Sequence, residues 1–104
     1  MPQPEFVSII SLIANPADFE GKSVRVIGFL VATFETTGLF LAEPDARNAV
    51  TKNGIWLEIE ASTYASLSNS YAIAEGTFDS KSRGHLSMWS GTIRDVTRLE
   101  AWRS

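Results

Sequence analysis

The longest apolar pattern in the chain runs over residues 23–34 and is rich in β-branched and aromatic side chains. Such residues suit a pleated, packed surface, so the pattern predicts one long strand. A period of two gives it one face of Val24, Val26 and Leu30 and another of Ile27, Phe29 and Val31. Gly28 lies near its middle. A glycine inside a strand marks a bulge, a bend or a close backbone approach, and a small closed barrel needs such a bend.

Four further segments show strand patterns, namely residues 38–41, 55–60, 71–78 and 85–99. The clearest alternation is in the segment 55–60, which directs Ile55, Leu57 and Ile59 inward. Gly76 and Gly91 fall inside the last two segments, where we expect further bends. In the last segment the apolar phase slips between Ile93 and Val96, which predicts a bulge near Arg94 and Asp95.

Three short helical segments are predicted, over residues 6–14, 16–19 and 61–69. Helical spacing gives the first an apolar face of Phe6, Ile9, Ile10 and Ile13. The Asn15-Pro16 pair ends this helix, because a residue before proline avoids the helical region. Gly21 is expected in the left-handed conformation after the second helix. The third helix is expected to plug one end of a barrel.

Polar segments connect these elements. Residues 35–38 predict a hairpin turn, and residues 79–84 predict a six-residue hairpin loop. The long connection 43–54 is expected to hold a helical turn over residues 45–50.

The order of elements is helical lead-in, three strands, a short helix and two strands. This is the order of the OB-fold, a five-stranded Greek-key barrel. The sequence therefore predicts an all-β fold with short helices, an N-terminal helical lead-in and a short helix between the third and fourth strands. At 104 residues we expect one domain, with the lead-in over residues 1–22 and the barrel over residues 23–100.

Several motifs resemble those of small stand-alone, uncharacterised bacterial OB-fold proteins. They are Asn15-Pro16-x-x-Phe19-x-Gly21-Lys22-x-Val24-x-Val26-x-Gly28, Thr51-Lys52-Asn53-Gly54-Ile55-Trp56-Leu57, Glu75-Gly76-Thr77-Phe78-Asp79, Gly84-His85-Leu86 and Ser90-Gly91-x-Ile93. The resemblance implies the fold. OB-folds in general bind single-stranded nucleic acid, oligosaccharides or proteins, and the fold does not choose among these.

Composition limits the classes of partner that we expect. The net charge is −3, with nine basic residues dispersed among twelve acidic ones, whereas nucleic-acid-binding domains usually carry a basic patch. The chain has no cysteine, which excludes disulfides and thiolate metal sites. No secretory signal or membrane-length apolar run is present, so we expect a cytoplasmic protein without membrane contact. A mature form that had lost a leader peptide would give the same pattern.

In OB-folds the ligand usually lies on the second and third strands, flanked by the loops between strands one and two and strands four and five. Here that surface would carry Phe40 and Trp56, flanked by Thr36, Thr37, Lys81 and Arg83. The aromatic rings could stack bases or sugars, or anchor a protein. Alternatively, Trp56 packs under the connection 43–54 or under the N-terminal helix.

Glu58 and Glu60 share the outward phase of Trp56 and would repel phosphates, so this face favours a sugar or protein ligand over nucleic acid. His85 is the single histidine and has no evident catalytic partner, so a structural or surface role is expected. Trp89 is expected in the core. Trp102 would cover the apolar helix or form a dimer contact.

Enzyme signatures are missing from the sequence: it has no phosphate-binding glycine loop, no nucleophile elbow and no two-histidine metal pair. We therefore predict a protein with no catalytic residues, no metal site and no cofactor. The expected function is a binding module that recognises a protein, its own copy included, or a small ligand. The alternative is a single-stranded nucleic-acid-binding protein.

Overall fold

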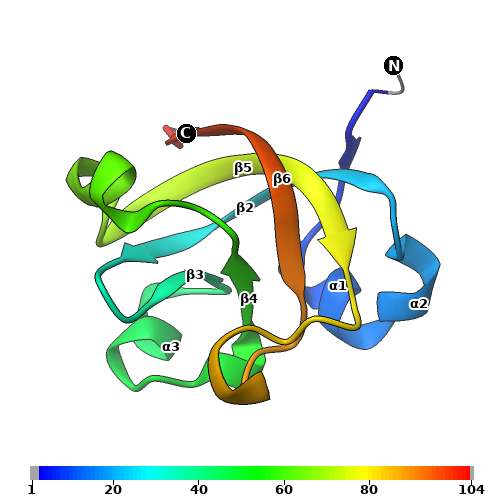
Figure 1. Ribbon diagram of the computed structural model, residues 1–104, viewed down its shortest axis with the longest axis horizontal. Helices are drawn as coiled ribbons and strands as arrows, with labels where there is room; N and C mark the ends of the chain where they lie inside the picture. Colours follow the sequence, from blue (N-terminus) through cyan, green and yellow to red (C-terminus); the bar gives the residue numbers. More distant parts are fainter. Residues whose placement is uncertain (1–2, 104) are drawn as a thin grey trace.

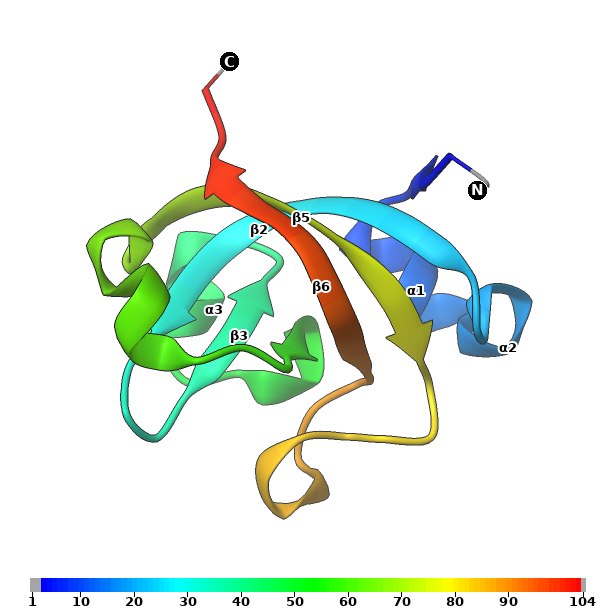
Figure 2. The same ribbon diagram turned by 45° about the horizontal axis from the view of Figure 1, so that its top comes forward.

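The apolar run after Lys22 forms β2 (Ser23–Ala32), the strand on which the barrel is built. It pairs antiparallel with β5 (Ser70–Asp79) along most of its length, and its last residues pair antiparallel with β3 (Thr37–Phe40). Figure 2 shows the strong curvature of β2, β5 and β6. Because β2 is long and bent, it joins two parts of one sheet, as the sequence predicted.

The other pairings close the sheet on itself. β3 pairs with β4 (Gly54–Leu57), β4 runs parallel to β6 (Thr92–Ala101), and β6 returns antiparallel to β5. The computed structural model describes residues 3–103. It is a mostly β protein with short helices, a five-stranded, mixed, closed barrel that is compatible with an OB-like fold (Figure 1). A short additional strand, β1 (Glu5–Phe6), runs parallel to β2.

Alternation along β2 fills the barrel as predicted, since Val24, Val26 and Leu30 are all buried in the main core. Gly28 also lies at a close approach of neighbouring segments, one of the roles that the sequence indicated for it. A Cβ atom there would lie 2.6 Å from the Phe40 carbonyl oxygen and 2.7 Å from the Ile9 side chain. The glycine therefore lets β3 and the N-terminal helix approach the same point of β2.

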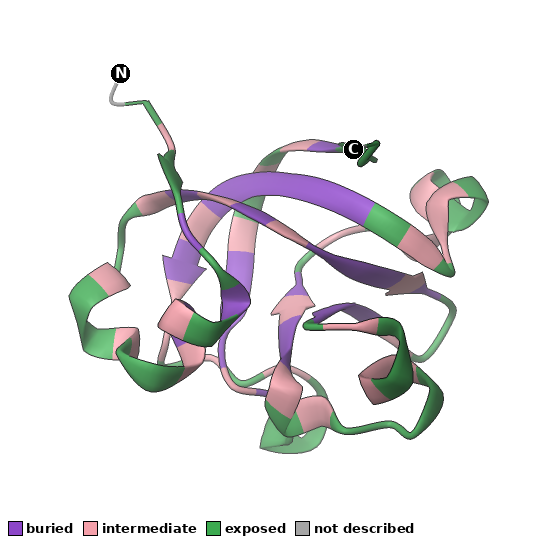
Figure 3. Cartoon of the chain, turned by 180° about the vertical axis from the view of Figure 1, so that it is seen from behind, coloured by how far each residue is buried: buried purple, intermediate pink, exposed green. Residues whose placement is uncertain are grey.

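Short helices cover the core on two sides. α1 (Ile9–Ala14) buries Ile9 and Leu12, and η2 (Ala61–Leu67) packs Tyr64 and Leu67 against the same core. Figure 3 shows the buried residues concentrated along the strands and the exposed ones over helices and loops. The predicted short helix between the third and fourth barrel strands is thus present, with 3₁₀ geometry.

The N-terminal segment is helical over a shorter range than residues 6–14, and its predicted apolar face is partly wrong. Phe6 is 57% exposed in β1, where it pairs with Arg25, and Ile10 is 60% exposed. The helix begins only after Ser8, whose hydroxyl accepts a hydrogen bond from the Ser11 backbone N–H as an N-cap. The predicted helix boundaries are confirmed: α2 (Pro16–Phe19) follows Asn15, and Gly21 has φ of 74°.

The last strand is shorter than the predicted segment 85–99, because it begins at Thr92. Backbone φ is positive at Gly84, Leu86 and Ser87, which an extended strand does not allow. Residues 80–91 instead form one long β5–β6 loop that includes η3 (His85–Ser87), so the predicted six-residue hairpin loop is also wrong. The predicted bulge is confirmed at Asp95, with φ of 51° and a register shift opposite Gly76.

The remaining connections differ in their bounds. The connection after β3 contains α3 (Glu43–Arg47), which begins two residues before the predicted turn, and η1 (Thr51–Asn53). β2 ends at Ala32, because the Thr33 N–H donates to the Thr36 carbonyl and closes the hairpin turn. Among residues 3–103 no helix has the length and apolar character needed to cross a membrane.

Candidate binding groove

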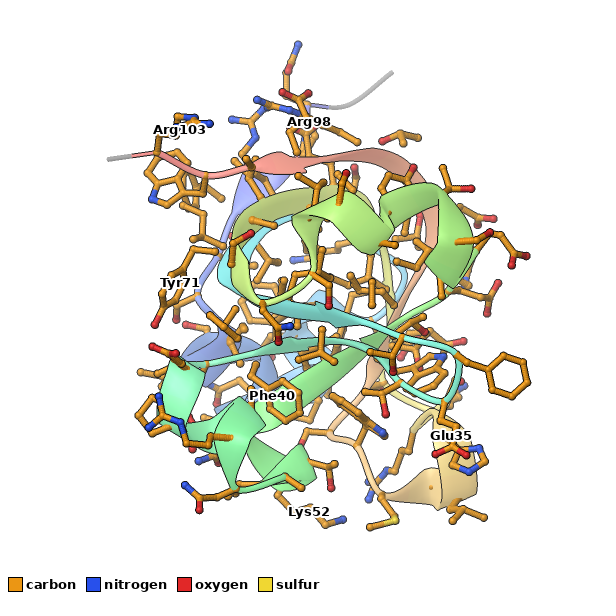
Figure 4. The ribbon with its side chains drawn as sticks, turned by 90° about the vertical axis from the view of Figure 1, so that its left-hand side faces the viewer. Glu35, Phe40, Lys52, Tyr71, Arg98 and Arg103 are labelled. Carbon is orange, nitrogen blue, oxygen red and sulfur yellow. The ribbon has the colours of Figure 1, made fainter. Side chains whose placement is uncertain are left out.

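Phe40 and Trp56, the two aromatic residues of the predicted binding face, lie together on the outer surface of β3 and β4. Phe40 is only 3% exposed, because Trp89 from the β5–β6 loop packs on it with ring centroids 5.0 Å apart. The same indole meets Trp56 edge-on at 5.4 Å. Figure 4 shows Phe40 enclosed by neighbouring segments. The predicted stacking surface is therefore occupied by the protein's own Trp89.

Two glycines make room for the Trp89 ring. Gly38 lies opposite Trp56 in the strand register, and Gly54 lies opposite Phe40. A Cβ atom on Gly38 would overlap the Trp89 ring, and one on Gly54 would come within 2.7 Å of it. Aromatic and glycine positions thus alternate over β3 and β4 and form a slot that fits one indole. Trp89 is 3% exposed in this slot, which confirms its expected core role.

Trp56 is partly covered by a segment that neither alternative named. Gly84 lies against its side chain, and a Cβ atom at Gly84 would come within 2.7 Å of Trp56 Cγ. The exposed His85 ring stacks near Trp56, with centroids 6.4 Å apart. Trp56 therefore packs under the β5–β6 loop, whereas the sequence suggested the connection 43–54 or the N-terminal helix.

The four flanking candidates have different environments. Thr37 belongs to β3 and is buried, and its hydroxyl donates to the Leu57 carbonyl at 2.8 Å. Thr36 is half-buried in the preceding turn, where its carbonyl accepts from the Thr33 N–H. Lys81 and Arg83 are exposed on the β5–β6 loop, and within residues 3–103 neither forms an ion pair.

An open cavity of about 440 Å³ lies beside Trp56, between the β2–β3 turn and the segment that follows β4. We call it the hairpin groove. It is lined by Ala32, Thr33, Phe34, Thr37, Trp56, Ile59, Glu60, Ala61, Ser62 and Ala65. Phe34 is 99% exposed at its rim. The lining is mostly apolar, and the small side chains of β2 and η2 leave the space open.

Sequence reasoning missed the groove, although Trp56 and Thr37 are in it. The predicted strand 23–34 includes Phe34, whereas β2 ends at Ala32 and Phe34 lies in the turn. The available signal was a single aromatic residue directly before the polar turn Glu35-Thr36. An aromatic side chain in a turn has few neighbours to cover it, so this position indicated exposure.

One carboxylate lines the groove, and two more lie on the segments that border it. Glu60 lines it, Glu35 follows Phe34 in the turn, and Glu58 precedes the η2 side of the lining. All three carboxylates are exposed, and in the described part of the chain none of them forms an ion pair. The segments 33–38 and 57–67 carry no lysine or arginine. An occupant of the groove would therefore meet negative charge.

A second charged group, which the sequence did not reveal, lies across the strands. Glu75 on β5 is buried, and its Oε2 accepts from Arg98 at 2.7 Å and from Arg25 at 2.9 Å. The hydrogen bond from Arg98, followed by that from Arg25, lowers the pKa of Glu75 although burial opposes this. The Glu75 carboxylate joins three strands, since Arg25 is on β2 and Arg98 on β6.

Two kinds of catalytic group were sought in the sequence, a paired histidine and a metal cluster. Within residues 3–103 the His85 side chain donates or accepts no hydrogen bond, and no group of three histidine or acidic side chains could hold a metal ion. No protein-family model, curated protein or solved structure matches the chain.

Proposed function

We propose that the protein is an OB-fold binding module without catalytic activity and that it recognises a protein partner through the hairpin groove. The observation that carries this proposal is Phe34, an aromatic side chain exposed beside an open apolar cavity. The strand order β2-β3-β4-β6-β5, closed by the β2–β5 pairing and containing one parallel pair, supports the OB assignment.

A protein partner fits the groove better than a small ligand does. Exposed aromatic residues next to a pocket are typical anchors of protein interfaces, where tryptophan and other aromatic side chains contribute most of the binding free energy. Small-molecule sites usually enclose most of the ligand surface. The hairpin groove is open, and Phe34 is exposed at its rim, so a partner can contact the cavity and the ring at once.

The groove offers less to single-stranded nucleic acid, the alternative function. That class combines a positively charged track with several exposed aromatic rings. Here Phe40 is covered by Trp89, and the carboxylate of Glu60 lines the groove. Lys81 and Arg83 remain available on the β5–β6 loop, but neither lines the groove.

Peptide selection tests the proposal. A phage-displayed random peptide library is panned on the wild-type protein, and the affinity of the recovered peptides is measured by fluorescence anisotropy. Phe34→Ala removes the exposed ring and Ala65→Trp fills the groove, and each should weaken binding by at least about tenfold. Since both side chains are exposed, the free energy of unfolding should change by less than about 0.5 kcal/mol.

Phe6→Ala is the matched control, because Phe6 is also an exposed phenylalanine but lies on β1. It should leave peptide affinity unchanged. Peptides that bind the Phe34→Ala and Ala65→Trp proteins as tightly as the wild type would overturn the hairpin groove as the recognition site.

A further inference from the structure

We infer that the hairpin groove binds a segment of another protein in which an apolar side chain is flanked by lysine or arginine residues. This inference rests on the proposed function and adds the chemistry of the partner. The apolar lining and Phe34 select an aliphatic or aromatic side chain. The charges around that lining select what flanks it.

The charges on the groove are of one sign. Glu60 is part of the lining, and Glu35 and Glu58 lie on the two segments that border it. Figure 4 shows Glu35 on the β2–β3 turn, on the side toward the β5–β6 loop. Elsewhere in the described chain, arginines neutralise exposed acidic side chains, as Arg47 does at Glu43 and Arg94 at Asp95. Among residues 3–103, Glu35, Glu58 and Glu60 form no ion pair, so their negative charge is available to a partner.

The same charges argue against two other occupants. A second copy of the chain docked by its own groove would bring both sets of carboxylates together, and like charges across an interface are destabilising. A nucleic-acid strand would place phosphates beside them. Lys81 and Arg83 are not among the residues that line the groove. A basic segment gains attraction where these occupants meet repulsion.

Three labelled heptapeptides separate these ideas. Each has a central Leu-Phe-Leu, flanked on both sides by a pair of lysines, serines or glutamates. Binding is measured by fluorescence anisotropy at low salt, about 50 mM, where surface charges are weakly screened. We expect the lysine-flanked peptide to bind about tenfold more tightly than the serine-flanked one, because each exposed ion pair contributes only a few-fold. The glutamate-flanked peptide should bind most weakly.

The variant Glu35→Gln/Glu58→Gln/Glu60→Gln should abolish this order while keeping the affinity for the serine-flanked peptide. None of the three side chains makes a hydrogen bond within residues 3–103, so the fold should be unaffected. The matched control is Glu5→Gln/Asp18→Asn/Glu43→Gln, which changes the net charge equally but away from the groove. It should retain the full preference for lysine flanks.

The outcomes distinguish the two proposals. Binding that depends on Phe34 but ignores the flanks, or a preference that survives the groove substitutions, would overturn the basic partner and leave the groove standing. Failure of all three peptides to bind the wild-type protein, together with failure of the library selection, would overturn the proposed function itself.

Discussion

Single glycines determine which aromatic side chains this surface exposes. Gly38 and Gly54 replace side chains that would otherwise fill the space over β3 and β4, and the Trp89 ring lies there instead. Neither glycine has a positive φ, so their role is space and not backbone freedom. Phe40 is buried and Trp56 is partly covered as a consequence, whereas Phe34 is exposed at the rim of the groove.

Gly38→Ala should therefore lower the free energy of unfolding by about 1–3 kcal/mol through overpacking against Trp89. Trp89→Leu shortens the clashing ring, so Gly38→Ala should cost much less in that background. Thermal or urea unfolding of the four proteins gives the coupling energy.

Gly21→Ala is the control for this cycle. Gly21 has φ of 74° and no neighbour within 4 Å of its Cβ position, so alanine there costs about 1 kcal/mol through the backbone alone. Trp89→Leu should not change that cost. Equal costs of Gly38→Ala with and without Trp89→Leu would contradict the slot.

At the scale of elements, the Glu75 carboxylate links three strands by hydrogen bonds where the barrel bends. Arg25 on β2 and Arg98 on β6 both donate to Glu75 on β5, close to the bulge at Asp95. The bulge interrupts the β5–β6 ladder next to Gly76, so the side-chain bonds supplement backbone pairing where it is interrupted.

This arrangement predicts a pH dependence. The folded-state pKa of Glu75 lies below its ordinary value of 4.5, because Arg98 and Arg25 stabilise the carboxylate. The resulting stability is fully present above the unfolded-state pKa and is lost as pH falls through the lower, folded-state pKa. Glu75→Gln should cost about 1–2 kcal/mol at pH 7, and the difference from the wild type should shrink in acid.

Urea unfolding at neutral and acid pH measures this difference. Glu43→Gln is the control, because Glu43 forms only an exposed ion pair with Arg47 on α3, and the expected change is at most about 0.5 kcal/mol. A Glu75→Gln difference that stays constant down to acid pH would show that the lost stability is not electrostatic.

The elements also show how far the sequence could be interpreted. Period-two alternation placed Val24, Val26 and Leu30 correctly inside, since burial of one face leaves a local signal. The predicted strand 85–99 wrongly includes part of the β5–β6 loop. Leu86 and Ser87 have positive φ values there, and neither residue type indicates such a conformation. The groove forms where the β2–β3 turn and the segment after β4 come close in space. No local sequence pattern predicts the distance between these two segments.

At the scale of the whole molecule, two properties affect which partner can bind: the net charge and the burial of the outer face of β3 and β4. The net charge is −3, and arginines 25, 47, 94 and 98 are engaged in ion pairs. The outer face of β3 and β4 is covered by Trp89. These properties disfavour binding of a phosphate backbone, and they favour the hairpin groove, an open and mostly apolar cavity, as the proposed binding site.

The wild-type protein should therefore not bind fluorescein-labelled oligo(dT) or oligo(U) at tens of micromolar protein, even at low salt, about 20 mM, where phosphate contacts are strongest. Anisotropy titration against both oligonucleotides makes the measurement. The variant Lys81→Ala/Arg83→Ala removes the exposed basic side chains of the β5–β6 loop and is compared in parallel. Binding that falls steeply with salt and disappears in this variant would mean that the loop, and not the groove, recognises the ligand. That ligand would then be single-stranded nucleic acid, because loss with salt and with two basic residues identifies contacts to phosphates.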